Sequence, residues 1–305
     1  MRYRRFLPVL IAIVLTVGTL GLLGAGTASA APAGGGGGPF TCSGTPRSPG
    51  VLAGRFSSVV VAGTCVVNAG PASVRGNVVV TPGSVLLAAF ALNDTTHSGT
   101  SSLAVGGNLV VRFGGTLIMG CSAAHFACID DPSQKHPTLN SSSTVGGSLV
   151  ALGALGVVVH SSSIGGSVLE RGGGGGLSCT PAGVFRQFKS PVYSDYEDNW
   201  VGGVMAITGL RSCWLGALRN HVRHSFLALG NRMADPDANE LVSNFIRGGM
   251  ACFRNFPAVQ FGDSHGVPNL VGRFAIGQCG FRVLKPNPAP NGPLTPISVP
   301  ARHRM

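Results

Sequence analysis

The chain has 305 residues, 47 of them glycine, and a formal net charge of +11. Only 11% of the residues are charged, which is too few for a coiled coil or a charged disordered chain. The glycines follow no Gly-X-Y period, which excludes collagen. A chain of this length can bury a large core in one or two domains.

The first 30 residues have the pattern of a signal peptide. A basic segment at 1–5, with three arginines, precedes an apolar run at 6–23, and Ala-Ser-Ala follows at 28–30. This order predicts cleavage after residue 30 and export from a bacterium, with membrane contact only through the signal. An uncleaved membrane anchor is the alternative, for which the apolar run is slightly short. A glycine-rich linker is expected at 31–41.

The eight cysteines all lie after the predicted signal. In an exported chain an even number of cysteines predicts disulfides, here four. We expect consecutive pairing out of 105 possible connectivities, namely Cys42 with Cys65, Cys121 with Cys128, Cys179 with Cys213, and Cys252 with Cys279. Neither C-x-x-C nor C-x-x-H occurs, so the cysteines predict no metal site.

A short repeat organises the middle of the chain. Each copy has an aliphatic residue, any residue, usually glycine, a small or polar residue, and another apolar residue. The five clear copies are Val74-Arg75-Gly76-Asn77-Val78, Val105-Gly106-Gly107-Asn108-Leu109, Val145-Gly146-Gly147-Ser148-Leu149, Ile164-Gly165-Gly166-Ser167-Val168 and Val201-Gly202-Gly203-Val204-Met205. Weaker copies start at Val222, Ile246 and Leu270. The longer intervals between copies contain polar or cysteine-bearing segments, as insertions in a repeat do.

The repeat predicts an all-β fold, a single-stranded right-handed parallel β-helix over residues 42–285 with loop insertions. Each coil would hold short strands joined by tight glycine turns, with the aliphatic residues stacked inside. A second strand falls at the same phase after the first two copies, at 85–87 and 117–118. The small or polar residues at the fourth place of the first four copies are expected to stack as a polar ladder: Asn77, Asn108, Ser148 and Ser167. A β-sandwich with glycine-rich turns is the alternative.

The V-x-G-N-L pattern resembles that of the right-handed parallel β-helix proteins exported by actinobacteria-like Gram-positive organisms, and is similar to that of the polymer-forming bactofilins. The resemblance covers residues 59–281 and implies architecture but no particular activity. Outside it, the five-glycine run at 172–176 marks a loop leaving the coils. Asp235-Pro236 predicts at most one short helix, and the Pro-rich residues 286–305 predict a disordered tail.

The β-helix resemblance also implies a possible polysaccharide lyase or hydrolase. Hydrolases of this fold place acidic, histidine and basic motifs on neighbouring coils, and the chain has Asn93-Asp94, Asp130-Asp131, His265-Gly266 and Lys285. Asp131 and His265 would lie several coils apart, farther than paired catalytic groups can be. Ser122–His125 and 262–266 resemble protease motifs, without an aspartate motif between them. We therefore expect no catalytic residues.

The acidic residues form two groups, one at 195–198 and one at 235–240. Asp235, Asp237 and Asn239 have the alternating oxygen spacing that begins a Ca²⁺ loop, but glycine at the sixth place and an acid at the twelfth are missing. A solvated loop is the favoured interpretation, a Ca²⁺ site the alternative, and no other cofactor is predicted.

Most of the aromatic residues with a polar edge lie in one stretch, Tyr193, Tyr196, Trp200 and Trp214. They are candidate polymer contacts, with core packing as the alternative. The basic residues are scattered, without the stripe of a nucleic-acid-binding protein. The sequence predicts a non-catalytic structural or binding protein of the cell envelope or extracellular space, with polysaccharide or its own copies as partners; a polysaccharide-active enzyme is the alternative.

Overall fold

A computed structural model describes residues 37–261, 266–280 and 283–284 of the chain. Nearly all regular structure in these residues is β, and one 3-10 turn, η1 (Gly183–Arg186), is the only helical element described. Among the described residues, no helix has the length and hydropathy needed to cross a bilayer. The predicted signal (1–30) and Pro-rich tail (286–305) lie outside the described residues.

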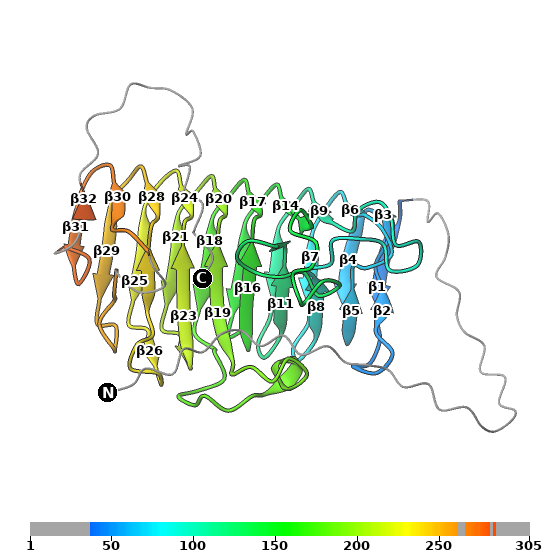
Figure 1. Cartoon of the computed structure of the whole chain (residues 1–305), viewed down its shortest axis with the longest axis horizontal. Coiled ribbons are helices and arrows are strands. Elements are labelled where there is room, and N and C mark those ends of the chain that lie inside the picture. Colours follow the sequence, from blue (N-terminus) through cyan, green and yellow to red (C-terminus); the bar gives the residue numbers. More distant parts are fainter. Residues whose placement is uncertain (1–36, 262–265, 281–282, 285–305) are drawn as a thin grey trace, which may run out of the picture.

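Three long parallel sheets form an elongated stack, consistent with a β-solenoid (Figure 1). Sheet I consists, in order, of β1 (Pro39–Cys42), β4 (Ser58–Val61), β7 (Val78–Val80), β10 (Leu109–Val111), β15 (Leu149–Leu152), β18 (Val168–Arg171), β21 (Met205–Thr208), β25 (Phe226–Leu229), β29 (Met250–Phe253) and β31 (Ala275–Gly277). Sheet II consists of β2 (Gly50–Val51), β5 (Thr64–Val66), β8 (Val85–Ala88), β11 (Thr116–Met119), β16 (Gly156–His160), β19 (Tyr193–Glu197), β23 (Trp214–Leu218) and β27 (Glu240–Val242). Sheet III consists of β3 (Gly54–Phe56), β6 (Ala72–Val74), β9 (Leu103–Val105), β14 (Thr144–Val145), β17 (Ser163–Ile164), β20 (Trp200–Val201), β24 (His221–Val222), β28 (Phe245–Ile246), β30 (Asn269–Val271) and β32 (Val283–Leu284).

Along the chain, a coil runs from a strand of sheet III to one of sheet I and then, in most coils, one of sheet II. The strands predicted to be in phase are paired: Val78 lies opposite Leu109, and Leu86 opposite Leu117. Two small sheets lie beside the coils, β12 (Cys121–Ser122) antiparallel to β13 (Asn140–Ser141), and β22 (Arg211–Ser212) parallel to β26 (Arg232–Met233). The strand signals in the sequence were therefore correct in place and phase.

The repeat motif forms the turn from sheet III to sheet I. Its aliphatic residues end one strand and begin the next, and both point into the core, where Val105 and Leu109 are buried. A Cβ on Gly107 would lie 2.8 Å from the backbone of Gly76 in the preceding coil, so only glycine allows the turns to stack this closely. The register corrects the last copy, which begins at Val271 rather than Leu270, because Val271 lies opposite Ile246.

The predicted polar ladder follows these turns on the outside of the coils. The Oδ1 of Asn77 accepts a hydrogen bond from the backbone N–H of Asn108 at 2.7 Å. Asn108 Oδ1 in turn accepts from Ser148 at 2.7 Å, and Ser148 Oγ accepts from Ser167 at 3.0 Å. The prediction is confirmed, and the ladder satisfies turn N–H groups that the strands leave unpaired.

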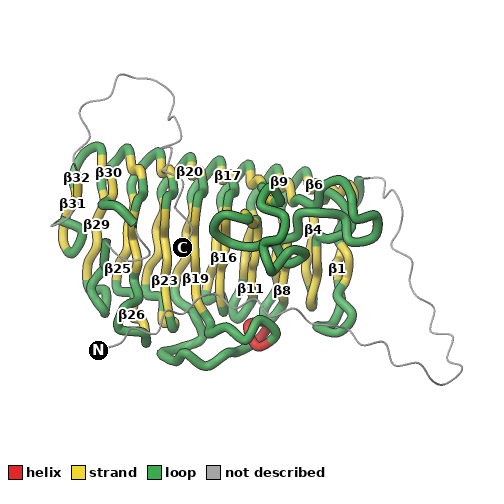
Figure 2. Tube along the Cα trace, viewed as in Figure 1, coloured by secondary structure: helices red, strands yellow, loops and turns green. Residues whose placement is uncertain are grey.

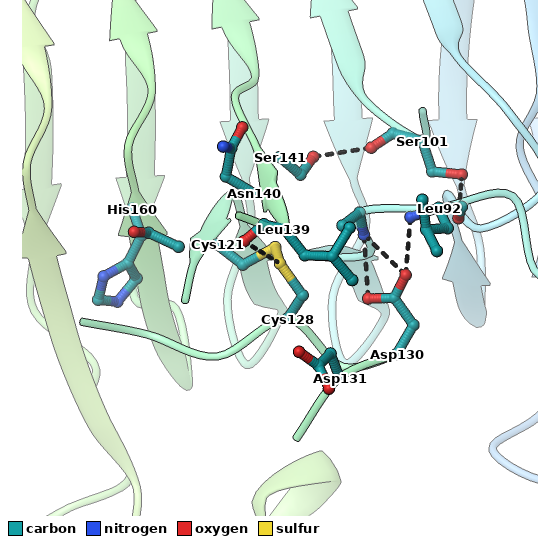
Figure 3. Close-up of a disulfide and its surroundings, with 12 residues drawn as sticks. Leu92, Ser101, Cys121, Cys128, Asp130, Asp131, Leu139, Asn140, Ser141 and His160 are labelled. Carbon is teal, nitrogen blue, oxygen red and sulfur yellow. Dashed lines mark hydrogen bonds between the residues drawn. A yellow bond between two sulfur atoms is a disulfide. The ribbon is translucent and has the colours of Figure 1, made fainter. Parts of the chain in front are cut away.

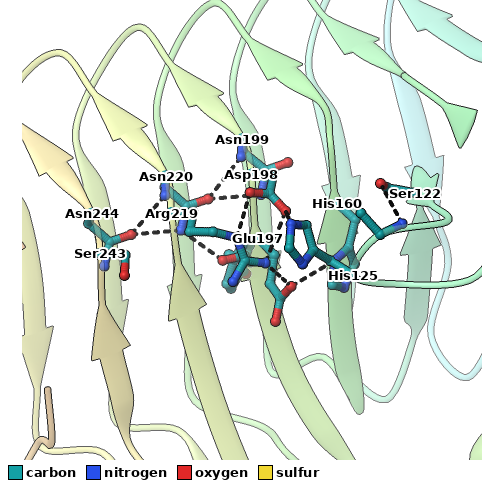
Figure 4. Close-up of polar contacts among 12 residues, drawn as sticks. Ser122, His125, His160, Glu197, Asp198, Asn199, Arg219, Asn220, Ser243 and Asn244 are labelled. Carbon is teal, nitrogen blue, oxygen red and sulfur yellow. Dashed lines mark hydrogen bonds and ion pairs between the residues drawn. The ribbon is translucent and has the colours of Figure 1, made fainter. Parts of the chain in front are cut away.

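A second, buried ladder lies at the turn from sheet II to sheet III and was not predicted. Asn199, Asn220, Asn244 and Asn269 are each at most 2% exposed. Asn220 Oδ1 accepts from both the backbone N–H and the Nδ2 of Asn199, and Asn244 and Asn269 repeat this pattern (Figure 4). Each asparagine stands two residues before the aliphatic residue that starts a repeat copy, a spacing that could have revealed the ladder.

All four disulfides join the consecutive cysteines that the sequence indicated, Cys42–Cys65, Cys121–Cys128, Cys179–Cys213 and Cys252–Cys279. Four disulfides indicate an oxidising, extracellular-type environment. The first strand, β1, starts within the range predicted as a linker, 31–41.

The five-glycine run at 172–176 does mark a loop leaving the coils, and all five glycines have a positive φ. The loop carries η1, visible as the only helical turn in Figure 2. The short helix predicted after Asp235 is wrong: Leu241 lies in β27, because coil stacking outweighs the local helix signal of Asp-Pro.

Candidate functional site

A shallow groove of ≈ 530 Å³ crosses four coils on the outer face of sheet III, over β6, β9, β14 and β17. These strands lie along the upper edge of the molecule in Figure 1. Ser73, Ala104, Thr144 and Ser163 form its floor and lie opposite one another in strict register. Their side chains point outward because strand residues alternate between core and solvent.

Beside this floor, the groove is lined by the turns of the repeat, at Arg75, Gly106, Gly146 and Gly165. A Cβ on Gly146 would lie 2.5 Å from the carbonyl oxygen of Gly106, and one on Gly165 equally close to that of Gly146. Gly146 and Gly165 therefore let the turns of these coils approach this closely. The same glycines leave the groove without side chains along this side.

Basic and aromatic side chains mark opposite ends of the groove. Arg55 lies opposite Ser73, so Arg55 and Arg75 stand at the N-terminal end. At the other end Trp200 lies opposite Ser163 and is 37% exposed. Its ring lies against Gly202, where a Cβ would be 2.9 Å from the indole.

The four aromatic residues predicted as polymer contacts lie in different surroundings. Trp200 lies on sheet III at the end of the groove, on the outer surface. Tyr193 and Trp214 lie on the outer face of sheet II, where their rings meet edge to face at 6.0 Å and both are partly buried. Tyr196 points into the core with 1% exposure, which leaves no surface for a polymer. Of the four, only Trp200 lies next to the groove, opposite Ser163.

A cluster of charged side chains lies on sheet II, a different face of the molecule. His160 ends β16, and Asp195 and Glu197 lie on the neighbouring strand β19, with His160 opposite Glu197. The Nε2 of His160 lies 3.4 Å from Asp195 Oδ2, and its Nδ1 lies 3.7 Å from Glu197 Oε2. His160 and Asp195 are 1% and 5% exposed, so strand alternation and register bring three ionisable groups together in a buried position.

Arg219 and Asp198 complete the cluster at the following turn (Figure 4). The Nη2 of Arg219 donates to Glu197 Oε2 at 2.5 Å and to Asp198 Oδ2 at 3.0 Å, and its Nε donates to Asp198 Oδ1 at 2.7 Å. Such a two-pronged pair with Asp198 fixes the guanidinium firmly. One arginine thus binds two carboxylates.

Burial shifts the ionisation of these groups. Burial raises the pKa of Asp195 to about 7, and burial together with the Asp195 carboxylate raises that of Glu197 to about 7. Burial lowers the pKa of His160 to about 4, although Glu197 and Asp198 oppose the shift. Burial thus disfavours the charged forms of His160, Asp195 and Glu197.

The loop between β12 and β13 covers the cluster. The ring of Phe126 stacks on that of His160, with centroids 4.1 Å apart and planes 11° apart. The Cys121–Cys128 disulfide closes the first turn of this loop beside His160 (Figure 3). His125, from the same loop, approaches Asp198 to 4.0 Å. The loop therefore shields His160 and Asp195 from solvent, whereas the side chain of Asp198 stays 26% exposed.

A further carboxyl group, that of Glu170, lies inside the coils. It points inward from β18 with 1% exposure. The hydroxyls of Ser194 and Tyr196 donate to its two oxygens at 2.8 and 2.9 Å. Burial raises the pKa of Glu170 to about 7.

The motifs that suggested a glycosidase take part in loop structure where they are described. Asp130 accepts hydrogen bonds from the backbone N–H groups of Ala91 and Leu92 (Figure 3). Asp131 accepts from those of Lys135 and His136. Asn93 accepts from the backbone N–H of Thr95, and Asp94 accepts from Asn68 Nδ2 at 2.8 Å. His265 and Lys285 lie outside the described residues.

The candidate Ca²⁺ residues form a turn rather than a cage. Asp235 Oδ1 accepts from the backbone N–H of Asp237 at 2.9 Å, as in an Asx turn. Asn239 is buried and its Nδ2 donates to the carbonyl of Pro257 at 2.7 Å. These bonds favour the interpretation as a structural turn.

The acidic group at 195–198 indicates part of the sheet II cluster in the sequence itself. Asp195-x-Glu197 lies on a strand, where residues two apart share a face. His160 and Arg219, however, join it only through the strand register, and an insertion stands between His160 and β19. No protein-family model, curated protein or solved structure matches the chain.

Proposed function

We propose that this protein is exported by a bacterium and binds an extended anionic polymer, such as a cell-envelope or extracellular polysaccharide, along sheet III without turning it over. The observation that carries the proposal is the groove whose floor is the registered row Ser73, Ala104, Thr144 and Ser163. Such a row presents nearly the same small surface at every coil, about every 4.8 Å. A repeating ligand can use repeated contacts of this kind.

The chemistry of the groove supports a polar polymer. Three of the four floor residues carry hydroxyls, which both donate and accept hydrogen bonds. Trp200 offers an exposed aromatic face at one end, and Arg55 and Arg75 offer positive charge at the other. The net charge of +11 falls to +8 once Arg2, Arg4 and Arg5 are removed with the predicted signal, and this positive charge still attracts anionic polymers in general. A neutral or an anionic polysaccharide can stack on Trp200, but only the anionic one engages both ends.

Two finer parts of this proposal have separate support. The crossover that joins two parallel strands of one sheet is right-handed in nearly all proteins. We therefore propose a right-handed, single-stranded β-helix. The repeat motif and the predicted signal favour a place among exported β-helix proteins of actinobacteria-like organisms. The four disulfides agree with a final location at the cell surface or outside the cell.

Glycan-array binding by the oxidised protein, followed by product analysis, tests this proposal. We expect retention of anionic polysaccharides without new reducing ends or unsaturated products. Ala104→Trp fills the groove and Trp200→Ala removes the platform, and each should weaken binding at least tenfold. Leu169→Trp is the matched control, because Leu169 faces outward from sheet I and is 40% exposed. Equal binding by all variants would contradict the groove as the site.

A polysaccharide lyase or hydrolase remains the second candidate, favoured by the convergence of Asp195, Glu197 and Asp198 with Arg219. The cluster, however, lies on sheet II beneath the Phe126 loop and does not line the groove. Product formation that Glu197→Gln abolishes would establish the enzyme and overturn the binding proposal. Self-association through the coils is tested by sedimentation of the same samples.

A further inference from the structure

The sheet II cluster holds buried polar atoms that lack hydrogen-bond partners. Neither Nδ1 nor Nε2 of His160 has one, and neither does Asp195 Oδ1. A buried polar group without a partner destabilises the fold, and a buried unpaired charge does so more strongly. His160 is also held flat by Phe126, so its nitrogens are aimed at the two carboxylates of β19. This arrangement needs a further partner.

The charge of the cluster indicates that this partner is a cation. When ionised, Asp195, Glu197 and Asp198 carry three negative charges, and Arg219 balances one of them through its paired bonds to Asp198. Two negative charges remain beneath the loop between β12 and β13, where Phe126 covers His160. A divalent cation would neutralise both of them, and buried charges in proteins are typically paired or coordinate a metal.

We propose that His160, Asp195 and Glu197 bind one divalent transition-metal ion, with zinc as the best match. One donor atom from each residue lies within 4.8 Å of the other two. Two donors about 2.1 Å from one ion at the tetrahedral angle lie about 3.4 Å apart, which is the distance between His160 Nε2 and Asp195 Oδ2. Glu197 has a second carboxylate oxygen to offer the same ion while its Oε2 keeps the bond to Arg219.

The ligand types select the class of metal. Imidazole nitrogen suits zinc and its neighbours, whereas Ca²⁺ and Mg²⁺ prefer sites built from oxygen alone. Arg219 acts beyond the ligands, because its bond to Glu197 orients that carboxylate. Three protein ligands leave a fourth position for water, as in zinc sites that are not closed. The proposal is independent of the polymer groove, which lies on another sheet.

Metal titration of the full, oxidised protein tests the site. After treatment with a chelator and its removal, calorimetric titration with ZnCl₂ should give one ion per chain. Mn²⁺ should bind more weakly and Ca²⁺ more weakly still. Co²⁺ should give visible absorption bands of a four- or five-coordinate site, and X-ray absorption of the zinc form should show a single imidazole with oxygen ligands. Failure of the folded protein to bind zinc, or tighter binding of Ca²⁺, would overturn the proposal.

Two ligand variants and one control identify the residues. Asp195→Asn and Glu197→Gln should each weaken zinc binding at least tenfold, with circular dichroism showing that the variants fold. Asp237→Asn, on a turn outside the cluster, should bind zinc as the natural protein does. Unchanged affinity in both ligand variants would assign the zinc elsewhere and refute this site. If a variant does not fold, the X-ray absorption of the natural protein still decides, because more than one imidazole contradicts the proposed ligand set.

Discussion

The buried carboxyl group of Glu170 makes the stability of the coils depend on pH. Its pKa is raised from the ordinary value of 4.5 to about 7 by burial in the core. Between these two values the folded protein holds a proton that the unfolded chain has released. The free energy of unfolding therefore contains a contribution that is fully present below pH 4.5 and is lost as the pH rises through 7.

The substitution Glu170→Gln isolates this contribution. Glutamine has the shape of the protonated acid and can accept from Ser194 or Tyr196, yet it does not ionise. A shift from 4.5 to about 7 corresponds to about 3 kcal/mol of unfolding free energy. We expect the variant to match the natural protein at pH 4.5 and to exceed its stability by about 3 kcal/mol at pH 8.

Guanidinium unfolding of both oxidised proteins at the two pH values measures this difference. His160, Asp195 and Glu197 also titrate, but they are present in both proteins, so their effect cancels in the comparison. A constant difference in the free energy of unfolding at both pH values would refute the argument, since Glu170 would then ionise in the fold as it does in the unfolded chain.

Three further predictions concern stability and are checked by denaturant unfolding. Asn220→Ala breaks the buried ladder and should lower the free energy of unfolding by about 3 kcal/mol. Asn77→Ala, in the exposed ladder, should lower it by about 1 kcal/mol. Equal losses would show that burial does not strengthen the ladder. Gly216→Ala should cost about 2 kcal/mol, because its Cβ would collide with neighbouring side chains; an unchanged midpoint would mean that they move aside freely. Replacing Cys121 and Cys128 by alanine opens a loop with a sequence separation of 7 and should cost about 2 kcal/mol; no loss would mean that packing alone holds the loop.

The coil architecture could be predicted because it is local and periodic. A strand of alternating residues followed by a glycine turn repeats in the sequence, and the stacked turns need glycine at the places where it stands, as at Gly107. The disulfide pairing followed from the order of the cysteines, because each joins segments close along the chain. The start of the last copy, at Val271, was missed because only the strand register distinguishes it from Leu270.

The site residues could be predicted only in part. Trp200 stood out as a rare aromatic residue, but the sequence does not separate it from Tyr193, which faces outward from another sheet, or from Tyr196, which points into the core. The charged cluster depends on an unbroken register between β16 and β19 across a long insertion, which the sequence alone does not define. A periodic pattern in the sequence predicts which strands stack. Side-chain contacts between strands separated by an insertion can be identified only once the structure gives their register.

Hydroxyl-radical footprinting with the polysaccharide retained in the glycan screen tests the polymer groove most directly. Bound polymer should slow the oxidation of Trp200, on sheet III, while the exposed Phe113 and Phe253 react as before. Protection of Phe113 or Phe253 without protection of Trp200 would contradict binding along the groove.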